Sequence, residues 1–294
     1  MAIAVFKSNE AEEKVLASYD RLVELWGVRA ESHFAETRYG VTHCMTAGDS
    51  ANPPLMLFHG VGDNSAVMWM LNMKVLSQRY YCIAVDTLGG PGKSVPNGAY
   101  KKPDFSQTVW INELLAYFEL DSAYMAGVSN GAYMVFQYTT VHPEKVRKAV
   151  CLEGGIVLNP VKTMISTLLL MFPEILIPTD RNLLKVLKKM SSPATDMFEK
   201  HPLLAEHLIL LMKSHKQNAM FPHPIEKYSA AAGGAVKDKL YFLLGDHRRV
   251  VKQDTMDVLE QGGYRYKVVP GAGHGINHEQ PEAVHEEIFR FLSE

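Results

Sequence analysis

Cysteine is scarce in this chain of 294 residues, which contains only Cys44, Cys82 and Cys151. Their number is odd, and none of them belongs to a Cys-x-x-Cys pair of the kind that binds metals or exchanges disulfides. Cys82 and Cys151 fall within apolar runs that read as strands. We therefore expect buried thiols in a reducing compartment, a cytoplasmic protein and no metal site.

Long apolar runs and excess charge of one sign are also absent. The most apolar stretch, residues 165–172, ends at Pro173 and is too short to span a bilayer, and the first ten residues do not resemble a signal peptide. The formal net charge of −2 gives no field that would favour nucleic acid or an anionic membrane. We expect a globular protein with no membrane span and no nucleic-acid partner, existing as a monomer or homodimer.

Short apolar runs alternate with stretches of helical spacing along most of the chain. Residues 10–26 predict a helix and residues 34–47 a hairpin that turns at Gly40. Strands are predicted at 55–58, 81–85, 123–126, 146–152, 239–244 and 264–269, and helices at 68–78, 104–119 (capped by Asp104), 130–141, 253–260 and 281–292. This alternation is typical of an α/β fold with a mostly parallel sheet and helices on both faces.

The alternation stops between residues 155 and 225. This region has no clear strand pattern, is rich in Leu, Met and Lys, and is divided by seven prolines into short helical stretches. We expect an inserted helical cap at 155–225. A core would then be formed by residues 1–154 and 226–294.

Ser129 stands in the run Gly127-Val-Ser129-Asn-Gly131, between a predicted strand and a predicted helix. A serine at such a sharp turn has its hydroxyl exposed above the sheet, and the glycines let the neighbouring backbone approach. The five-residue pattern alone is weak evidence, because it arises by chance in a chain of this length about one time in ten. The remaining chemistry must therefore come from elsewhere in the chain.

His274 is the candidate base. It lies in a glycine-rich loop after the last predicted strand, at the sheet edge where parallel strands have their carboxyl ends, so it can meet Ser129. The turn after the first buried strand, His59-Gly60-Val61-Gly62, suggests an oxyanion hole made by the backbone N–H groups of Val61 and Asn130. His59 itself fits a buried structural role better than that of a base.

The glycine-rich loop Asp86–Ser94 raises the alternative of phosphate binding. Gly92-Lys93-Ser94 matches the end of a P-loop, but Thr87 stands where that pattern needs its first glycine. The spacing of a dinucleotide-binding loop is also missing. We therefore interpret the segment as a structural loop, and we expect no cofactor.

Together these features resemble the α/β-hydrolase fold serine hydrolases, and the resemblance covers nearly the whole chain. Its landmarks are His59-Gly60, Asp86 through Gly92-Lys-Ser94, Gly127-Val-Ser129-Asn-Gly131, Gly245-Asp246, and Gly273-His274 with Glu279-Gln-Pro281. Residues 17–26 and 37–43 are similar to a bacterial carboxylesterase group, whose members carry a helical cap in the position of 155–225. The order of nucleophile, acid and histidine along the chain is also the family's.

The acid of the expected triad departs from the family's pattern. The family places it three residues after the glycine of the next-to-last strand, but here that position is Arg248, which cannot accept the imidazole proton. Asp246 reaches the histidine only if the loop shifts, whereas Glu153 already ends the strand after the nucleophile helix. We favour Glu153 narrowly, with the reservation that an ion pair to Arg248 would undercut it. The third possibility is that no acid is present.

The predicted function is cleavage of carboxylic esters with apolar or small acyl groups through an acyl-enzyme. Apolar cap residues are expected to line the substrate site, with Trp69, Met125 and Tyr133 among its neighbours. The apolar cap residues in question are Met164, Leu168, Leu169, Met171, Phe172, Met190, Met197, Phe198, Leu208, Met212, Met220 and Phe221. Two alternatives remain: a ligand-binding relative that lost its acid, and a hydrolase of C–C or other acyl bonds.

Overall fold

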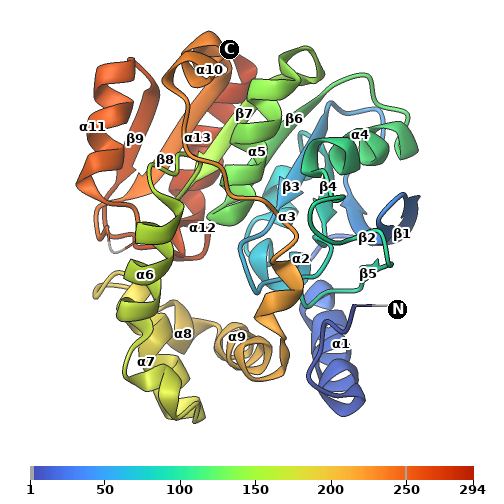
Figure 1. Ribbon diagram of the computed structural model, residues 1–294, viewed down its shortest axis with the longest axis vertical. Helices are drawn as coiled ribbons and strands as arrows, with labels where there is room; N and C mark the ends of the chain where they lie inside the picture. Colours follow the sequence, from blue (N-terminus) through green and yellow to red (C-terminus); the bar gives the residue numbers. More distant parts are fainter. Residues whose placement is uncertain (1–2, 249) are drawn as a thin grey trace.

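A single mixed β-sheet forms the centre of the computed structural model, which describes residues 3–248 and 250–294 (Figure 1). Its strands are β1 (Ala30–Thr37), β2 (Gly40–Ala47), β3 (Pro54–Phe58), β4 (Tyr81–Val85), β5 (Val95–Pro96), β6 (Ala123–Val128), β7 (Val146–Leu152), β8 (Leu240–Gly245) and β9 (Arg265–Val269). The order is β1-β2-β4-β3-β6-β7-β8-β9, with β5 beside β2. The pairs from β4 to β9 are parallel, and β1, β2 and β5 pair antiparallel, which confirms the predicted fold class.

Helices cover both faces of the sheet. They are α1 (Asn9–Glu24), α2 (Ser65–Met68), α3 (Met73–Leu76), α4 (Gln107–Tyr117), α5 (Asn130–Val141), α10 (Ala230–Ala235), α11 (Gln253–Gly262), α12 (Ile276–Glu279) and α13 (Pro281–Ser293), with the 3-10 turns η1 (Pro143–Lys145) and η4 (Lys237–Lys239). Successive strand side chains point to opposite faces and so enter two separate apolar cores. Leu55 and Leu57 of β3 join the core under α1, α3 and α13, whereas Met56 and Phe58 join the core under α4 and α5.

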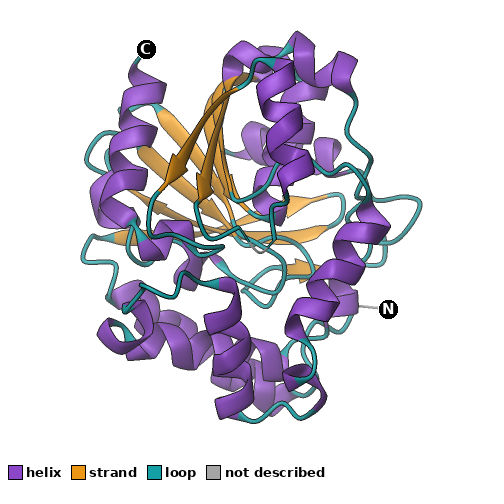
Figure 2. Cartoon of the chain, turned by 90° about the vertical axis from the view of Figure 1, so that its left-hand side faces the viewer, coloured by secondary structure: helices purple, strands orange, loops and turns teal. Residues whose placement is uncertain are grey.

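A helical layer, defined here as residues 155–225, lies between β7 and β8 in the chain. It contains α6 (Pro160–Met171), α7 (Asp180–Met190), α8 (Met197–Lys200) and α9 (Pro202–Ser214), with the 3-10 turns η2 (Glu174–Leu176) and η3 (Gln217–Met220). Figures 1 and 2 show these helices gathered beyond the sheet, on the side toward which several strand arrows point. The layer therefore lies over the carboxyl ends of the parallel strands.

Two predicted helices differ from the observed ones. Only α3 and Met68, the last residue of α2, are helical within the expected helix 68–78; between them the N–H groups of Met70 and Asn72 bond to carbonyls only three residues back, which forms turns. The expected helix 104–119 begins later, and Ser106 caps it in place of Asp104 by accepting the N–H of Val109 at 3.4 Å. A serine directly before the first helical turn is better placed to cap it than an aspartate two residues earlier.

Buried histidines hold the helical layer against the rest of the fold. His207 of α9 accepts a hydrogen bond from the Asn64 amide at 3.0 Å and donates one to the Ser18 hydroxyl at 2.7 Å, which ties α9 to α1 and to the start of α2. His215 and His223 bond through Nε2 to the carbonyls of Gly89 and Leu88. Burial lowers the pKa of each of these three histidines to about 4, so all are neutral near pH 7.

We therefore predict that the free energy of unfolding decreases as the pH falls from about 6.5 toward 4. In this window the unfolded chain binds protons at His207, His215, His223 and His278, whose folded pKa values all lie at about 4, while the folded protein does not. Urea titrations at several pH values between about 6.5 and 4 measure the free energy of unfolding. In His207→Gln this free energy should fall less steeply with decreasing pH than in wild-type protein. A free energy of unfolding that stays constant over this range would contradict the prediction.

Candidate active site

Ser129 occupies the turn between β6 and α5 in a backbone conformation that is rare for a residue with a side chain. Its φ is 56° and its ψ is −113°, and its N–H donates to the carbonyl of Leu152 on β7 at 2.9 Å. A Cβ on Gly131 would lie 2.2 Å from the carbonyl oxygen of Phe58, so only glycine lets α5 begin this close to β3. The sequence therefore builds the sharp turn that presents the Ser129 hydroxyl.

The imidazole of His274 lies between two oxygens. Its Nε2 is 3.1 Å from Ser129 Oγ, and its Nδ1 is 3.3 Å from Glu153 Oε2. An ionised carboxylate only accepts hydrogen bonds, so Nδ1 carries the proton and Nε2 is free to accept from the serine hydroxyl. The N–H of His274 donates to the carbonyl of Met190 at 2.8 Å, which fixes the histidine loop to the end of α7.

Glu153 is held rigidly at the end of β7. Its side chain is 1% exposed, and its φ of 49° is again unusual for a non-glycine residue. Its N–H donates to the carbonyl of Leu243 at 2.9 Å, and its Oε1 accepts the N–H of Gly245 at 2.6 Å. The neighbouring strand β8 thus orients the carboxylate, and the second oxygen is directed to His274.

The structure does not bring Asp246 to the imidazole. Asp246 is exposed, and its Oδ2 accepts the N–H of Gly271 at 3.1 Å, so it stabilises the loop after β9. Arg248 extends toward Gln253, with the two side chains 3.5 Å apart. Within residues 3–248 and 250–294, the side chains of Asp246 and Arg248 form no hydrogen bond or ion pair with His274 or Glu153. The ion pair of Glu153 with Arg248 that would have undercut the choice of Glu153 is not formed in this part of the chain.

The predicted oxyanion loop lies beside the serine. Val61 and Asn130 both line the cavity that contains Ser129, and their N–H groups have no hydrogen-bond partner among the described residues. His59 is fully buried; it donates from Nδ1 to the carbonyl of Gly60 at 2.8 Å and accepts the N–H of Thr87 at 2.9 Å. His59 is thus a structural residue that fixes the start of the loop, and burial lowers its pKa.

The glycine-rich segment after β4 is a structural loop. The buried carboxylate of Asp86 accepts hydrogen bonds from His43 Nδ1 and the N–H of Ser65, both at 2.8 Å, and from the N–H of Lys93 at 3.0 Å. A Cβ on Gly92 would lie 2.5 Å from the Asp86 carboxyl carbon. The loop therefore wraps around a carboxylate of its own and has no cradle for a phosphate.

Glu279 has a positioning role that the sequence reasoning did not assign. Its Oε1 accepts the N–H of Gly275, directly after His274, at 3.1 Å, and its Oε2 accepts the N–H of Ser192 in the helical layer at 2.7 Å. Burial raises its pKa. The only sequence signal was its place as a landmark of the histidine loop.

A cavity of about 520 Å³ lies between the sheet edge and the helical layer, and Ser129, Glu153 and His274 line it. Eight of the expected apolar residues line it as well: Met164, Leu168, Met171, Met190, Met197, Phe198, Leu208 and Met212. Four do not: Leu169, Phe172, Met220 and Phe221. Tyr133 also lines the cavity, but Trp69 and Met125 are buried in the two cores instead, which corrects the prediction for them.

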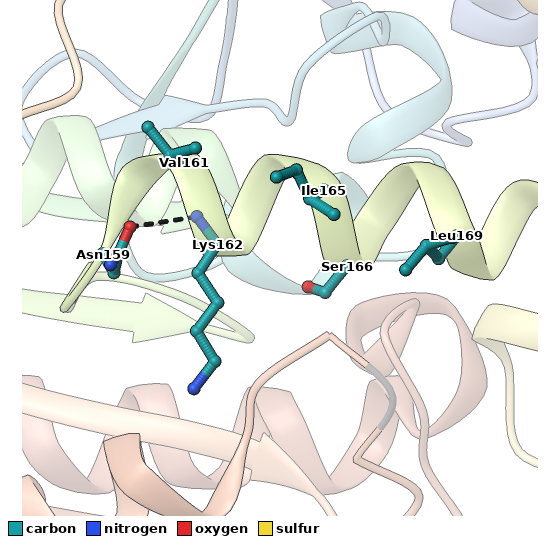
Figure 3. A pocket seen from close by; sticks show the side chains of 6 residues that line it. All are labelled: Asn159, Val161, Lys162, Ile165, Ser166 and Leu169. Atoms are coloured by element: carbon teal, nitrogen blue, oxygen red, sulfur yellow. Dashed lines mark hydrogen bonds between the residues drawn. The ribbon is translucent and has the colours of Figure 1, made fainter.

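A second, open hollow follows the outside of α6. Figure 3 shows its lining, which consists of Asn159, Val161, Lys162, Ile165, Ser166 and Leu169. None of the predicted catalytic or oxyanion-hole residues is among them, but Leu169, which was expected at the substrate site, is. In the described ranges, no group of three or more His, Cys, Asp or Glu side chains is placed to hold a metal ion, and no helix is long and apolar enough to cross a membrane.

The sheet order, the serine turn after β6 and the histidine loop after β9 are those of the α/β-hydrolase fold. Residues 53–177 match the family model described as alpha/beta hydrolase fold. In its sequence the chain is similar to carboxylesterases. It is 26% identical to the carboxylesterase YbfK of Bacillus subtilis, over 98% of this chain and 96% of that protein.

A second relative and two solved structures agree with this assignment. The uncharacterized carboxylesterase nap of Bacillus subtilis is 25% identical over 94% of this chain and 91% of its own length. The crystal structure of carboxylesterase CesB (YbfK) superimposes with a TM-score of 0.79 at 24% identity, covering 96% of this chain and 98% of that one. The crystal structure of naproxen esterase, also from Bacillus subtilis, gives a TM-score of 0.79 at 23% identity, covering 97% and 99%. The fold of the whole chain is therefore that of these proteins.

We predict that Glu279→Gln displaces the histidine loop. Glutamine replaces one carboxylate oxygen by an NH2 group, which cannot accept the N–H of Ser192 or of Gly275. One hydrogen bond is therefore lost and one N–H is left unpaired, which should lower the free energy of unfolding by about 1–3 kcal/mol. Urea unfolding should show this loss, and the reactivity of Ser129 toward an active-site probe should fall. Glu286→Gln, an exposed change on α13, is the matched control. Unchanged stability and reactivity in Glu279→Gln would rule out the positioning role.

Proposed function

We propose that this protein is a serine carboxylesterase that cleaves carboxylic esters with apolar or small acyl groups through an acyl-enzyme. One observation carries the proposal: the hydroxyl of Ser129, the imidazole of His274 and the carboxylate of Glu153 form a continuous hydrogen-bonded series at the wall of an apolar cavity. This is the arrangement that converts a serine hydroxyl into a nucleophile.

In the proposed first step Ser129 Oγ attacks the ester carbonyl carbon while His274 Nε2 takes the hydroxyl proton. The carbonyl oxygen becomes an oxyanion, and the N–H groups of Val61 and Asn130 donate hydrogen bonds to it. The protonated imidazole then gives its proton to the departing alcohol oxygen, which leaves the acyl group on the serine. Water attacks this acyl-enzyme by the same route in reverse, and the carboxylic acid is released.

Glu153 serves the imidazole rather than the substrate in this proposal. Its carboxylate holds the proton on Nδ1 and stabilises the positive charge that His274 acquires during both steps. The bond from Gly245 to the other carboxylate oxygen prevents the side chain from turning away. Asp246, which accepts the N–H of Gly271, has no part in the proposed chemistry.

The cavity supports apolar esters as the substrate class. Methionine, leucine and phenylalanine side chains from the helical layer make up much of its wall, and methionine adapts to acyl groups of different shape. We propose that residues 155–225 act as a cap that encloses the acyl or alcohol group. The expected cytoplasmic location and the monomeric or homodimeric state remain predictions.

The alternative of a non-catalytic relative rested on the absence of an acid, and Glu153 next to His274 removes that argument. A C–C bond hydrolase remains chemically close. A hydrolase of another substrate, 2-hydroxy-6-oxo-6-phenylhexa-2,4-dienoate hydrolase of Rhodococcus, shares the fold with a TM-score of 0.72 at 17% identity. Likeness at that level concerns the fold alone, so ester cleavage is the function we propose.

A fluorophosphonate probe tests the nucleophile. The folded protein should form a covalent adduct at Ser129, detected by mass spectrometry of the peptide, and Ser129→Ala should form none. The absence of an adduct in folded wild-type protein would refute the proposed acyl-enzyme.

Turnover of a short-chain aryl ester tests the acid. We expect Glu153→Gln to lower kcat by about a hundredfold or more, because the amide no longer fixes the tautomer or offsets the imidazolium charge. Asp246→Asn is the matched control and should change kcat by less than about threefold, since its carboxylate lies on the Gly271 N–H. The reverse order of effects would assign the acid to Asp246.

A further inference from the structure

Asp63 is a carboxyl group inside the catalytic centre that the mechanism above does not use. It lies in the loop that carries Val61, and it lines the cavity with Ser129 and His274. A Cβ on Gly60 would lie 3.1 Å from Asp63 Oδ2 and 3.5 Å from Ser129 Cβ, so the carboxyl is next to the side chain of the nucleophile. An acyl group attached to Ser129 would therefore lie close to the carboxyl of Asp63.

The carboxyl of Asp63 has no internal partner. Within residues 3–248 and 250–294 its oxygens accept no hydrogen bond and form no ion pair, although its own N–H donates to the carbonyl of Gly60 at 3.4 Å. Glu153 and Asp254, the other acidic residues that line the cavity, are both engaged: the first with His274 and Gly245, the second with Lys162 at 3.4 Å. Asp63 is thus the one acidic side chain of the described cavity wall with its acceptor capacity unused.

An unpaired carboxyl at this position has an energetic consequence. Burial raises the pKa of Asp63 to about 7, against the opposing influence of a charged His274. A negative charge here also disfavours the oxyanion that forms during ester cleavage. Both costs are removed if the substrate itself brings a positive charge to the carboxylate, since pairing offsets the desolvation of the ion.

We propose that Asp63 forms a subsite for a cationic nitrogen, so that the enzyme prefers esters carrying a protonated or quaternary amine near the scissile bond. The subsite deepens the proposed esterase function and rests on it. The apolar wall from the helical layer suits the carbon substituents of such an amine, and the carboxylate of Asp63 supplies the charge. Among the other titratable groups on the wall, His215 and His278 have pKa values of about 4 and are neutral near pH 7, and Glu153 is bonded on both oxygens. Asp254 is paired with Lys162, and Lys252 precedes it in the chain, so these charges gather at the start of α11.

Two pairs of isosteric esters test the subsite. Acetylcholine is compared with neohexyl acetate for the alcohol side, and betaine ethyl ester with ethyl tert-butylacetate for the acyl side, at a pH above the pKa of Asp63. Each pair differs only in a quaternary nitrogen against a quaternary carbon. We expect wild-type protein to favour the cationic member of at least one pair in kcat/KM, and Asp63→Asn to reduce the ratio of cationic to neutral kcat/KM by about tenfold or more.

Asp121→Asn, which removes an exposed loop carboxylate outside the cavity, is the control and should leave both ratios unchanged. Equal ratios in wild-type protein and Asp63→Asn, for both pairs, would overturn the subsite while leaving the esterase function standing. If wild-type protein cleaves neither member of either pair, the proposed function fails instead. Calorimetric titration with tetramethylammonium then decides the subsite, since binding to wild-type protein but not to Asp63→Asn supports it and equal or absent binding refutes it.

Discussion

The contact between the ends of β7 and β8 governs the active site. The carboxylate of Glu153 accepts the N–H of Gly245, and the N–H of Glu153 donates to the carbonyl of Leu243. The main chain of β8 thus fixes the side chain at the end of β7. The positive φ of Glu153 is tolerated because both ends of the residue are tied in this way. The imidazole of His274, and through it the serine hydroxyl, take their orientation from this carboxylate. A hydrogen-bonded sheet edge therefore sets the geometry of the chemistry.

The sequence was sufficient for the sheet and for the turns that carry the candidate site residues, because these depend on local patterns. Strands with short apolar runs, such as β4 and β7, and the glycines around Ser129 have a direct backbone cause. The choice between Glu153 and Asp246 was not decidable in this way. It depends on which carboxylate a neighbouring strand turns toward His274, and only the three-dimensional contacts with Gly245 and Gly271 show that.

Other features were beyond the sequence for a similar reason. Glu279 connects two segments that are far apart in the chain, Ser192 and Gly275, and no spacing rule predicts such a bridge. No sequence pattern singles out Asp63, because its position depends on its neighbours in space. Trp69 and Met125 were expected at the cavity, but the alternation of side chains along β6 directs Met125 into the core on one face of the sheet.

Hydrogen bonds join the helical layer to the loop that carries His274. The carbonyl of Met190 at the end of α7 accepts the N–H of His274. The carboxylate of Glu279 accepts the N–H groups of both Ser192 and Gly275, the residue directly after His274. The layer therefore cannot swing away as a free lid, because lifting α7 would also release the base from its serine. If the layer moved in this way to admit a substrate, His274 would lose its position beside Ser129, and it would regain that position only when the layer returned. In the proposed function, productive chemistry therefore requires the helical layer to stay docked on the histidine loop.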